Sequence, residues 1–196
     1  MSYFMSEKNH DELFVLFHGT GGNEYSLLFL TGELNPHASI ISFLGENGKG
    51  KDRRFFAPLE NQQLDVADFQ NAVSAFLEEW DRLSLRSTYS KIIFIGYSNG
   101  ANFIQGILQE RPDIADETLL LHPQEFKLTF SKKAEKNQLV ITTGANDTLS
   151  IPGNILQLKN RLNDSFPEVS FIITDGGHEM IDEEVSQIKT WYQRKA

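Results

Sequence analysis

The ten residues Lys91–Gly100, with the sequence KIIFIGYSNG, decide the fold of this chain. Their first half is a short apolar run, which is typical of a strand that helices cover on both faces. Their second half is the pattern G-x-S-x-G, and a helical pattern runs from Asn99 to Glu110 and stops before Pro112. A strand, a sharp turn and a helix in this order would raise the Ser98 hydroxyl above the sheet. We therefore predict that Ser98 is a nucleophile; the pentapeptide alone also fits an ordinary serine in a tight turn.

Further strands and helices are predicted on both sides of this stretch. Short apolar segments, often β-branched, predict strands, and apolar residues spaced by three and four positions predict helices between them. Asp65 can cap the longest helix, and Pro152 suits the first turn of another. The other predicted strands are Leu13–Phe17, Ser39–Leu44, Thr118–Leu121, Gln138–Thr143 and Val169–Thr174. The other predicted helices cover Glu24–Leu34, Phe69–Leu83, Pro152–Leu162 and Ile181–Tyr192.

This alternation of strands and helices predicts the fold class. It indicates βαβ units in a single α/β domain over residues 1–196, with about six mainly parallel strands and helices on both faces. Residues 1–11 would form a poorly ordered or peripheral N-terminal segment. In such sheets the ligand site lies beyond the carboxyl ends of the strands. The residues that directly follow each strand are therefore the candidates for function.

Composition excludes several classes of partner and site. The 196 residues carry a net charge of −9, from 18 Lys and Arg against 27 Asp and Glu, and they include no cysteine. The acidic balance disfavours a nucleic acid or an anionic membrane as partner. Without cysteine there is no disulfide, thiolate metal site or cysteine nucleophile. No signal-like run precedes Leu13, and no apolar stretch approaches the roughly 20 residues that cross a bilayer. We expect a soluble, cytoplasmic protein.

Two further candidates follow predicted strands. Asp147 ends the sequence GAND after one strand, and His178 ends the sequence DGGH after the last strand. A serine nucleophile needs a histidine base, and that histidine needs a buried carboxylate that fixes its tautomer. Asp175 is the competing acid, but it ends the strand that carries the histidine loop, so its side chain should not point back at His178. Serine, acid and histidine in this chain order match the order of α/β-hydrolase triads.

A glycine-rich loop, HGTGGN, follows the first predicted strand from His18 to Asn23. The negative charge of a tetrahedral intermediate needs two preset N–H donors. The main-chain N–H of Asn99, next to the nucleophile, would supply one donor, and that of Thr20 would supply the other. His18 is predicted to fix this loop through hydrogen bonds rather than to react.

Taken together, these segments resemble the phospholipase/carboxylesterase group of small α/β-hydrolases. The resemblance extends over residues 13–192. Its motifs are specific in combination and weak singly. The matching segments are His18–Glu24, Gly96–Asn102, Gly144–Asp147 with Pro152, and Gly177 with His178; Arg53–Phe56 is similar to that family's loop at the active-site mouth.

The resemblance implies roles for individual residues. Ser98 would be the nucleophile, Asp147 the acid, His178 the base, and Thr20 and Asn99 the oxyanion hole, with no metal or cofactor. Many relatives have glutamine where this chain has Asn99, which leaves the subgroup and the substrate open. The sheet would lack the first two strands of the usual fold, because the oxyanion loop follows the first predicted strand here.

Two other functional motifs fit the sequence less well. Gly45–Asp52 nearly matches a phosphate-binding loop, but Asp52 replaces the hydroxyl that binds Mg²⁺ and no helical pattern follows. The five histidines contain no H-E-x-x-H and no helical i, i+4 pair, which disfavours a zinc hydrolase. His122 is predicted to be a packed, hydrogen-bonded histidine. A non-catalytic binding module on the same scaffold remains the alternative of another class.

The predicted function is hydrolysis of short-chain or small soluble carboxylic esters, with a thioesterase or lysophospholipase as the alternative. The expected partner is a small-molecule ester, and oligomeric state is left open. Residues 122–137 are too short and too polar for a helical lid domain. In the loop Gly45–Gln63, Phe55 and Phe56 would wall a small pocket. The predicted site is therefore open and modest in size.

Overall fold

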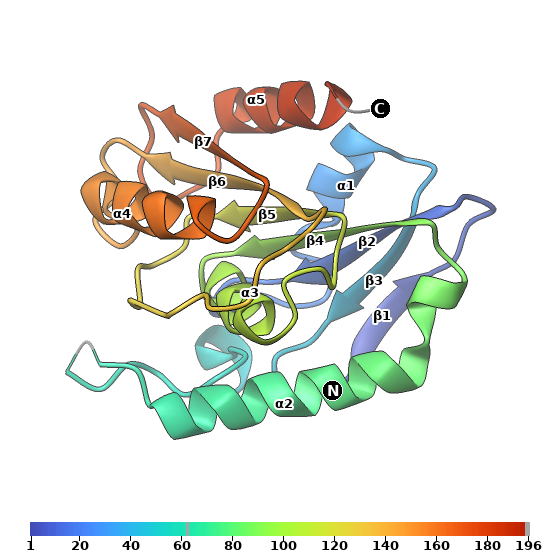
Figure 1. The fold of residues 1–196 in the computed structure, drawn as a ribbon, viewed down its shortest axis with the longest axis horizontal. Helices are drawn as coiled ribbons and strands as arrows, with labels where there is room; N and C mark the ends of the chain where they lie inside the picture. The colour runs from blue at the N-terminus through green and yellow to red at the C-terminus, as the bar shows by residue number, and fades with distance from the viewer. Residues whose placement is uncertain (62, 195–196) are drawn as a thin grey trace.

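The structure is a computed structural model, and it describes residues 1–61 and 63–194. One seven-stranded sheet runs through it in the order β1-β3-β2-β4-β5-β6-β7 (Figure 1). The edge strand β1 pairs antiparallel with β3, and every other pairing is parallel. The strands are β1 (Tyr3–Ser6), β2 (Glu12–Phe17), β3 (Ser39–Phe43), β4 (Lys91–Tyr97), β5 (Glu117–Leu121), β6 (Gln138–Gly144) and β7 (Glu168–Thr174).

Helices cover both faces of this sheet (Figure 1). α1 and α5 pack in the hydrophobic cluster on one face, and α2, α3 and α4 pack in the cluster on the other. This arrangement confirms the predicted α/β class. The helices are α1 (Leu28–Leu34), α2 (Val66–Leu83), α3 (Asn99–Glu110), α4 (Pro152–Asn163) and α5 (Asp182–Gln193), with short 3₁₀ turns η1 (Gly50–Asp52) and η2 (Leu85–Ser87).

β2 explains why the strands are continuously apolar. Every side chain from Leu13 to Phe17 is fully buried. Successive side chains of a strand point to opposite faces. The odd-numbered ones accordingly pack with α2, α3 and α4, and the even-numbered ones pack with α1 and α5.

β1 is the strand that the sequence analysis missed. Residues 1–11, expected to be poorly ordered or peripheral, place Tyr3–Ser6 at the edge of the sheet, opposite Ile40–Phe43. Its four residues are exposed or partly exposed, so they lack the apolar run of a central strand. The sheet thus has a strand before the one that carries the oxyanion loop. We expected the first two strands of the usual fold to be missing. That expectation is wrong for one of them, because β1 is present.

α1 begins later than predicted, at Leu28 rather than Glu24. The Asn23 side chain accepts a hydrogen bond from the Tyr25 N–H at 2.9 Å, and the Asn23 carbonyl accepts one from the Ser26 N–H at 3.1 Å. This local bonding holds the chain in turns before the helix starts. α2 begins as predicted after Asp65, whose side chain accepts from the Asp68 N–H.

The turn from β4 to α3 depends on both glycines of the pentapeptide. A Cβ on Gly100 would lie 2.0 Å from the Phe17 carbonyl oxygen, and one on Gly96 would lie 2.7 Å from the Ala101 nitrogen. Such distances are far inside van der Waals contact. The glycines therefore allow α3 to start directly against β2 and β4, which places residue 98 above the carboxyl ends of the strands.

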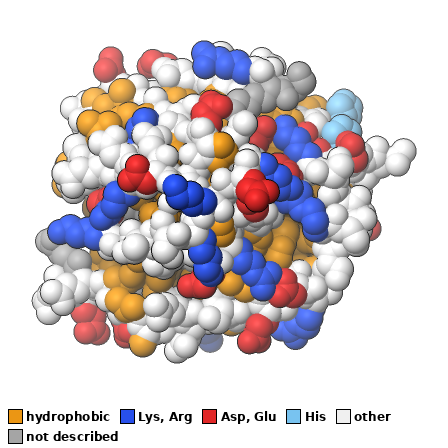
Figure 2. Space-filling model, in the orientation of Figure 1, with side chains coloured by type: hydrophobic (Ala, Val, Ile, Leu, Met, Phe, Trp, Pro, Cys, Tyr) orange, Lys and Arg blue, Asp and Glu red, His pale blue; other side chains and the backbone are white. Residues whose placement is uncertain are grey.

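The exterior carries charges of both signs. Figure 2 shows Lys and Arg side chains interspersed with Asp and Glu on the face that it draws. Among residues 1–61 and 63–194, no helix combines the length and the apolar character needed to cross a membrane. The segment 122–137 contains no helix, and in the described part of the chain no large lid stands over the sheet.

Candidate active site

Ser98 occupies the sharp turn between β4 and α3. Its backbone has φ 50° and ψ −111°, a conformation that a residue with a side chain rarely adopts. Its hydroxyl Oγ lies 2.9 Å from Nε2 of His178. A strained residue at a helix N-terminus, with a histidine in hydrogen-bond contact, has the geometry of an activated nucleophile.

His178 and Asp147 reach this serine from two neighbouring strand ends. His178 follows β7, Asp147 follows β6, and His178 Nδ1 lies 2.8 Å from Asp147 Oδ2. The other carboxylate oxygen, Oδ1, accepts hydrogen bonds from the N–H groups of Leu149 and Ser150, each at 2.8 Å. Burial alone would raise the pKa of Asp147, but its hydrogen bonds outweigh burial and lower the pKa. The carboxylate is therefore held ionised.

Asp175, the competing acid, lies elsewhere. Its side chain is exposed, and its main-chain carbonyl accepts a hydrogen bond from Asn146 Nδ2 at 2.8 Å. Asp147 is the carboxylate that contacts His178.

Thr20 and Asn99 line the same cavity as Ser98. Within residues 1–61 and 63–194, neither N–H donates to another protein group. The Asn99 side chain is buried, and its Oδ1 accepts a hydrogen bond from the Phe55 N–H at 2.8 Å. Asn99 thus fastens the loop 45–61 to the start of α3. No local sequence pattern predicts this hydrogen bond between Asn99 and Phe55.

His18 braces the glycine-rich loop, as predicted. Its ring Nδ1 lies 2.7 Å from the Gly19 carbonyl, and its Nε2 accepts a hydrogen bond from the Gly45 N–H at 3.0 Å. Because Nε2 accepts, Nδ1 carries the proton and donates it. Burial lowers the pKa of His18, in keeping with this neutral form. His18 therefore fixes the loop through hydrogen bonds.

Tyr97, which precedes the nucleophile, was not singled out from the sequence. Its hydroxyl donates a hydrogen bond to the His178 carbonyl at 2.6 Å and so holds the histidine loop over Ser98. Burial, followed by the nearby charges of Glu184, Asp147 and Glu179, raises the pKa of Tyr97 to about 12. The hydroxyl therefore keeps its proton. The only sequence feature that could have indicated this role is the position of Tyr97 at the end of a buried strand.

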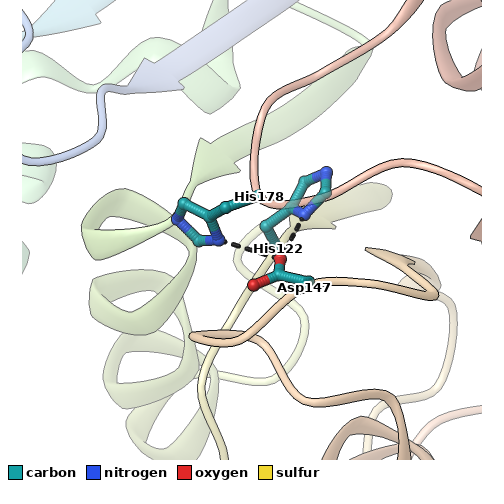
Figure 3. A group of neighbouring side chains, drawn as sticks. All are labelled: His122, Asp147 and His178. Atoms are coloured by element: carbon teal, nitrogen blue, oxygen red, sulfur yellow. Dashed lines mark hydrogen bonds and ion pairs between the residues drawn. The ribbon is translucent and has the colours of Figure 1, made fainter.

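His122 is a packed, hydrogen-bonded histidine, as predicted, but its partners were not foreseen. It lies just after β5 and is fully buried. Its Nδ1 lies 2.8 Å from Asp147 Oδ2, the oxygen that His178 also contacts. Figure 3 shows both rings directed at this one carboxylate.

These three side chains could also be considered as metal ligands. The candidate ligand atoms of His122, Asp147 and His178 lie within 4.8 Å of one another. The ring nitrogens that face Asp147 are already at the hydrogen-bond distance of 2.8 Å. An ion would have to displace both hydrogen bonds, and the metal-free site stays a prediction.

A cavity of about 650 Å³ opens over Ser98. Phe56 lines it, whereas Phe55 is buried in the core and stacks on Phe103 at a centroid distance of 5.0 Å. The expectation that both phenylalanines wall the pocket is therefore wrong for Phe55. A second cavity, of about 300 Å³, lies beside the glycine-rich loop. The two cavities share the lining residues Thr20, Tyr97 and Glu179.

Comparison with solved structures supports the fold. A carboxylesterase from Bacillus cereus superposes with a TM-score of 0.90 and is 26% identical over 100% of this chain and 95% of that one. The chain has the α/β-hydrolase fold. A carboxylesterase from Mesorhizobium loti superposes with a TM-score of 0.84 at 22% identity, over 95% of this chain and 90% of that one.

Sequence comparison supports the same resemblance. MhqD of Bacillus subtilis strain 168, whose name assigns it provisionally to the hydrolases, is 27% identical over 197 residues, 98% of each chain. No protein-family model matches the chain. The predicted resemblance to the small α/β-hydrolases of the phospholipase/carboxylesterase group is confirmed by these relatives.

Proposed function

We propose that this protein is a serine hydrolase that cleaves carboxylic esters through an acyl-enzyme intermediate. The observation that carries the proposal is the unbroken hydrogen-bonded chain from Ser98 through His178 to Asp147. The three residues follow the carboxyl ends of three different strands, β4, β6 and β7. A cavity opens over the serine. The carboxylesterase and hydrolase names of the relatives agree with it.

The proposed reaction has two halves, acylation of Ser98 and hydrolysis of the acyl-enzyme, and His178 transfers a proton in both. Ser98 Oγ attacks the ester carbonyl carbon while its proton passes to His178 Nε2. The bond to the leaving oxygen breaks, and that oxygen takes the proton from Nε2 and departs as an alcohol. A water then gives a proton to Nε2, and its oxygen adds to the acyl carbon. The acid leaves as Ser98 recovers its proton.

The other residues would stabilise the charges that this sequence creates. The N–H groups of Thr20 and Asn99 would bind the oxyanion of each tetrahedral intermediate. The ionised Asp147 would fix the tautomer of His178 and stabilise its positive charge. Thr20 lines both cavities, so the two cavities could hold the acyl and the alcohol parts of a small ester next to the oxyanion hole.

Burst kinetics with p-nitrophenyl acetate test the proposal. Wild-type protein should release one p-nitrophenolate per chain rapidly and then turn over more slowly. The Ser98→Ala variant should fold normally and lose nearly all of this activity. If it retains more than about a tenth of the wild-type rate, a loss below roughly 1.4 kcal/mol, Ser98 is not the nucleophile.

The same assay separates the alternatives. Acyl thioesters and lysophospholipids with matched acyl chains distinguish a thioesterase or lysophospholipase from a carboxylesterase, because the same machinery can cleave all three. Neither a burst nor turnover with any of them would favour a non-catalytic binding module.

A further inference from the structure

His122 is held in an unusual position beside the proposed triad. Its backbone has φ 49°, in the left-handed region, and its side chain has no exposed surface. Its ring contacts two carboxylates at once: Nδ1 lies 2.8 Å from Asp147 Oδ2, and Nε2 lies 2.9 Å from Glu184 Oε2. Strained conformations persist only where surrounding contacts impose them. These two contacts are such constraints.

The two contacts of His122 require two protons, whereas a neutral histidine ring carries only one. A carboxylate oxygen only accepts, so each ring nitrogen that faces one must carry a proton. Asp147 Oδ2 accepts from His178 as well, so Asp147 is not the source of a proton. The extra proton therefore belongs to the pair of His122 and Glu184.

Glu184 indicates where this proton resides. It lies in the first turn of α5, where the helix dipole favours a negative charge. Its side chain is 1% exposed, and its second oxygen, Oε1, has no hydrogen-bond partner among the described residues. A buried carboxylate is costly unless a positive charge offsets it. His122 Nε2 lies 2.9 Å from Glu184 Oε2, and a doubly protonated His122 ring would supply that positive charge.

The electrostatic environment of His122 agrees with a protonated ring. Burial alone would lower its pKa, but hydrogen bonds and charges, first from Glu184 and then from Asp147, outweigh burial and raise the pKa. Tyr97 and His178 also face the ring, at centroid distances of 5.7 and 5.4 Å. Tyr97 is neutral, and its hydroxyl is engaged with the His178 carbonyl. Glu179, next to His178, is exposed.

We propose that His122 and Glu184 are positioning residues of this site: a buried His122 cation, kept charged by Glu184, fixes the Asp147 carboxylate against His178 and offsets part of its charge. This inference rests on the proposed serine hydrolase function. The chain Ser98–His178–Asp147 thus continues through His122 to Glu184, and it ties the loops after β5 and β6 to α5. The ionised cluster of His122, Asp147 and Glu184 carries a net charge of −1, the same as a lone triad carboxylate.

Three variants test the two parts of this role. His122→Asn keeps a donor where Nδ1 lies and tolerates the left-handed backbone, but removes the positive charge. Glu184→Gln removes the opposing negative charge with little change of shape, and the double variant removes both. Glu183→Gln is the matched control, because Glu183 is an exposed neighbour in the same helical turn. Each is assayed with p-nitrophenyl acetate for kcat, KM and the pH dependence of kcat/KM.

His122→Asn removes the positive charge that lies beside Asp147, so the pH profile of kcat/KM should change on its acidic side. We expect kcat to fall about 10-fold with KM within about 2-fold, and the acidic limb of kcat/KM to move up by about half a pH unit or more. The double variant should recover part of kcat and return the acidic limb toward the wild-type position, because it also removes the buried carboxylate that His122 offsets. The Glu183→Gln control should match wild type. If the His122→Asn protein folds and has the kcat and the acidic limb of the kcat/KM pH profile of wild type, His122 only supports the fold.

A measurement independent of turnover separates this inference from the proposed function. Nitrogen NMR of labelled histidine at neutral pH should give one signal pair typical of a doubly protonated ring, absent in His122→Asn and shifted to the neutral form in Glu184→Gln. A neutral His122 in wild-type protein overturns the proposal, even if His122→Asn fails to fold. A charged His122 in a protein whose Ser98 is not acylated would instead overturn the hydrolase function and, with it, the positioning role.

Discussion

Asp147 makes more contacts than the orientation of one histidine requires. Its two oxygens receive four N–H groups, from two histidine rings and from the main chain of Leu149 and Ser150. These donors keep the carboxylate ionised and leave it no freedom to rotate. Replacing it with an amide would therefore disturb the whole cluster, whereas the Asp175 side chain is exposed and makes no such contact with any other described residue.

Comparing these two acids tests the assignment of the triad. Asp147→Asn should lower kcat by about 10⁴-fold, because the amide favours the wrong tautomer of His178. Asp175→Asn, the matched control three residues before the histidine, should change kcat only slightly. Steady-state kinetics on both folded variants provide the measurement. A larger loss in Asp175→Asn would overturn the assignment.

The sequence could predict the site residues that follow strands, but it could not predict the residues that hold those side chains in place. Ser98, Asp147 and His178 each come directly after an apolar run, so topology alone brings them to one sheet edge. Glu184 is one of three adjacent acidic residues at the start of α5. Which of the three turns inward is decided by packing against His122, 62 positions away, and local patterns contain no such information.

At the scale of elements, the central strands and the helices α2 to α5 were predictable, whereas the edge strand was not. All six predicted strands appear within two residues of their expected ends, because burial on both faces demands continuous apolar runs. β1 is short, antiparallel and partly exposed, so its sequence resembles a loop. α3 matched its predicted bounds, since a glycine-rich turn precedes it and Pro112 follows it.

The contact of His122 with α5 predicts how stability depends on pH. A group whose pKa is raised by folding stabilises the folded state fully below its unfolded pKa, here 6.5, and this contribution is lost as pH rises through the folded pKa. The unfolding free energy lost in His122→Asn should therefore be largest below about pH 6.5 and should shrink as the pH rises above it into the alkaline range. Urea denaturation across this range measures it. The same substitution at the exposed His37 should show no such trend, and a loss at residue 122 that grows with pH contradicts the prediction.

At the scale of the whole molecule, no lid covers the cavity over Ser98 among residues 1–61 and 63–194. Residues 122–137 contain no helix, and Phe126, Leu128 and Phe130 pack against the core instead of forming a cover. The loop 45–61 is likewise anchored, by Phe55 in the core and by Asn99. The sequence indicated both loops by length, but not that Phe55, Phe126 and Phe130 pack into or against the core.

This openness predicts the preferred acyl length. A long acyl chain would leave much of its apolar surface in water and would gain little of the roughly 0.8 kcal/mol that each buried methylene contributes. Among p-nitrophenyl esters, kcat/KM should peak at short acyl chains, with no jump in rate as the substrate passes from monomer to micelle. A maximum at about twelve carbons or beyond, or activation at the interface, would show an apolar channel or a mobile cover.

The most direct measurement is the site of covalent labelling by a fluorophosphonate, read by mass spectrometry of the intact chain and of its peptides. Wild-type protein should gain one adduct per chain, on the peptide that contains Ser98, and Ser98→Ala should gain none. Asp175→Asn, the control outside the cluster, should label like wild type. An adduct on another residue, or ester hydrolysis that persists in an unlabelled Ser98→Ala protein, would contradict the central claim that Ser98 is the nucleophile.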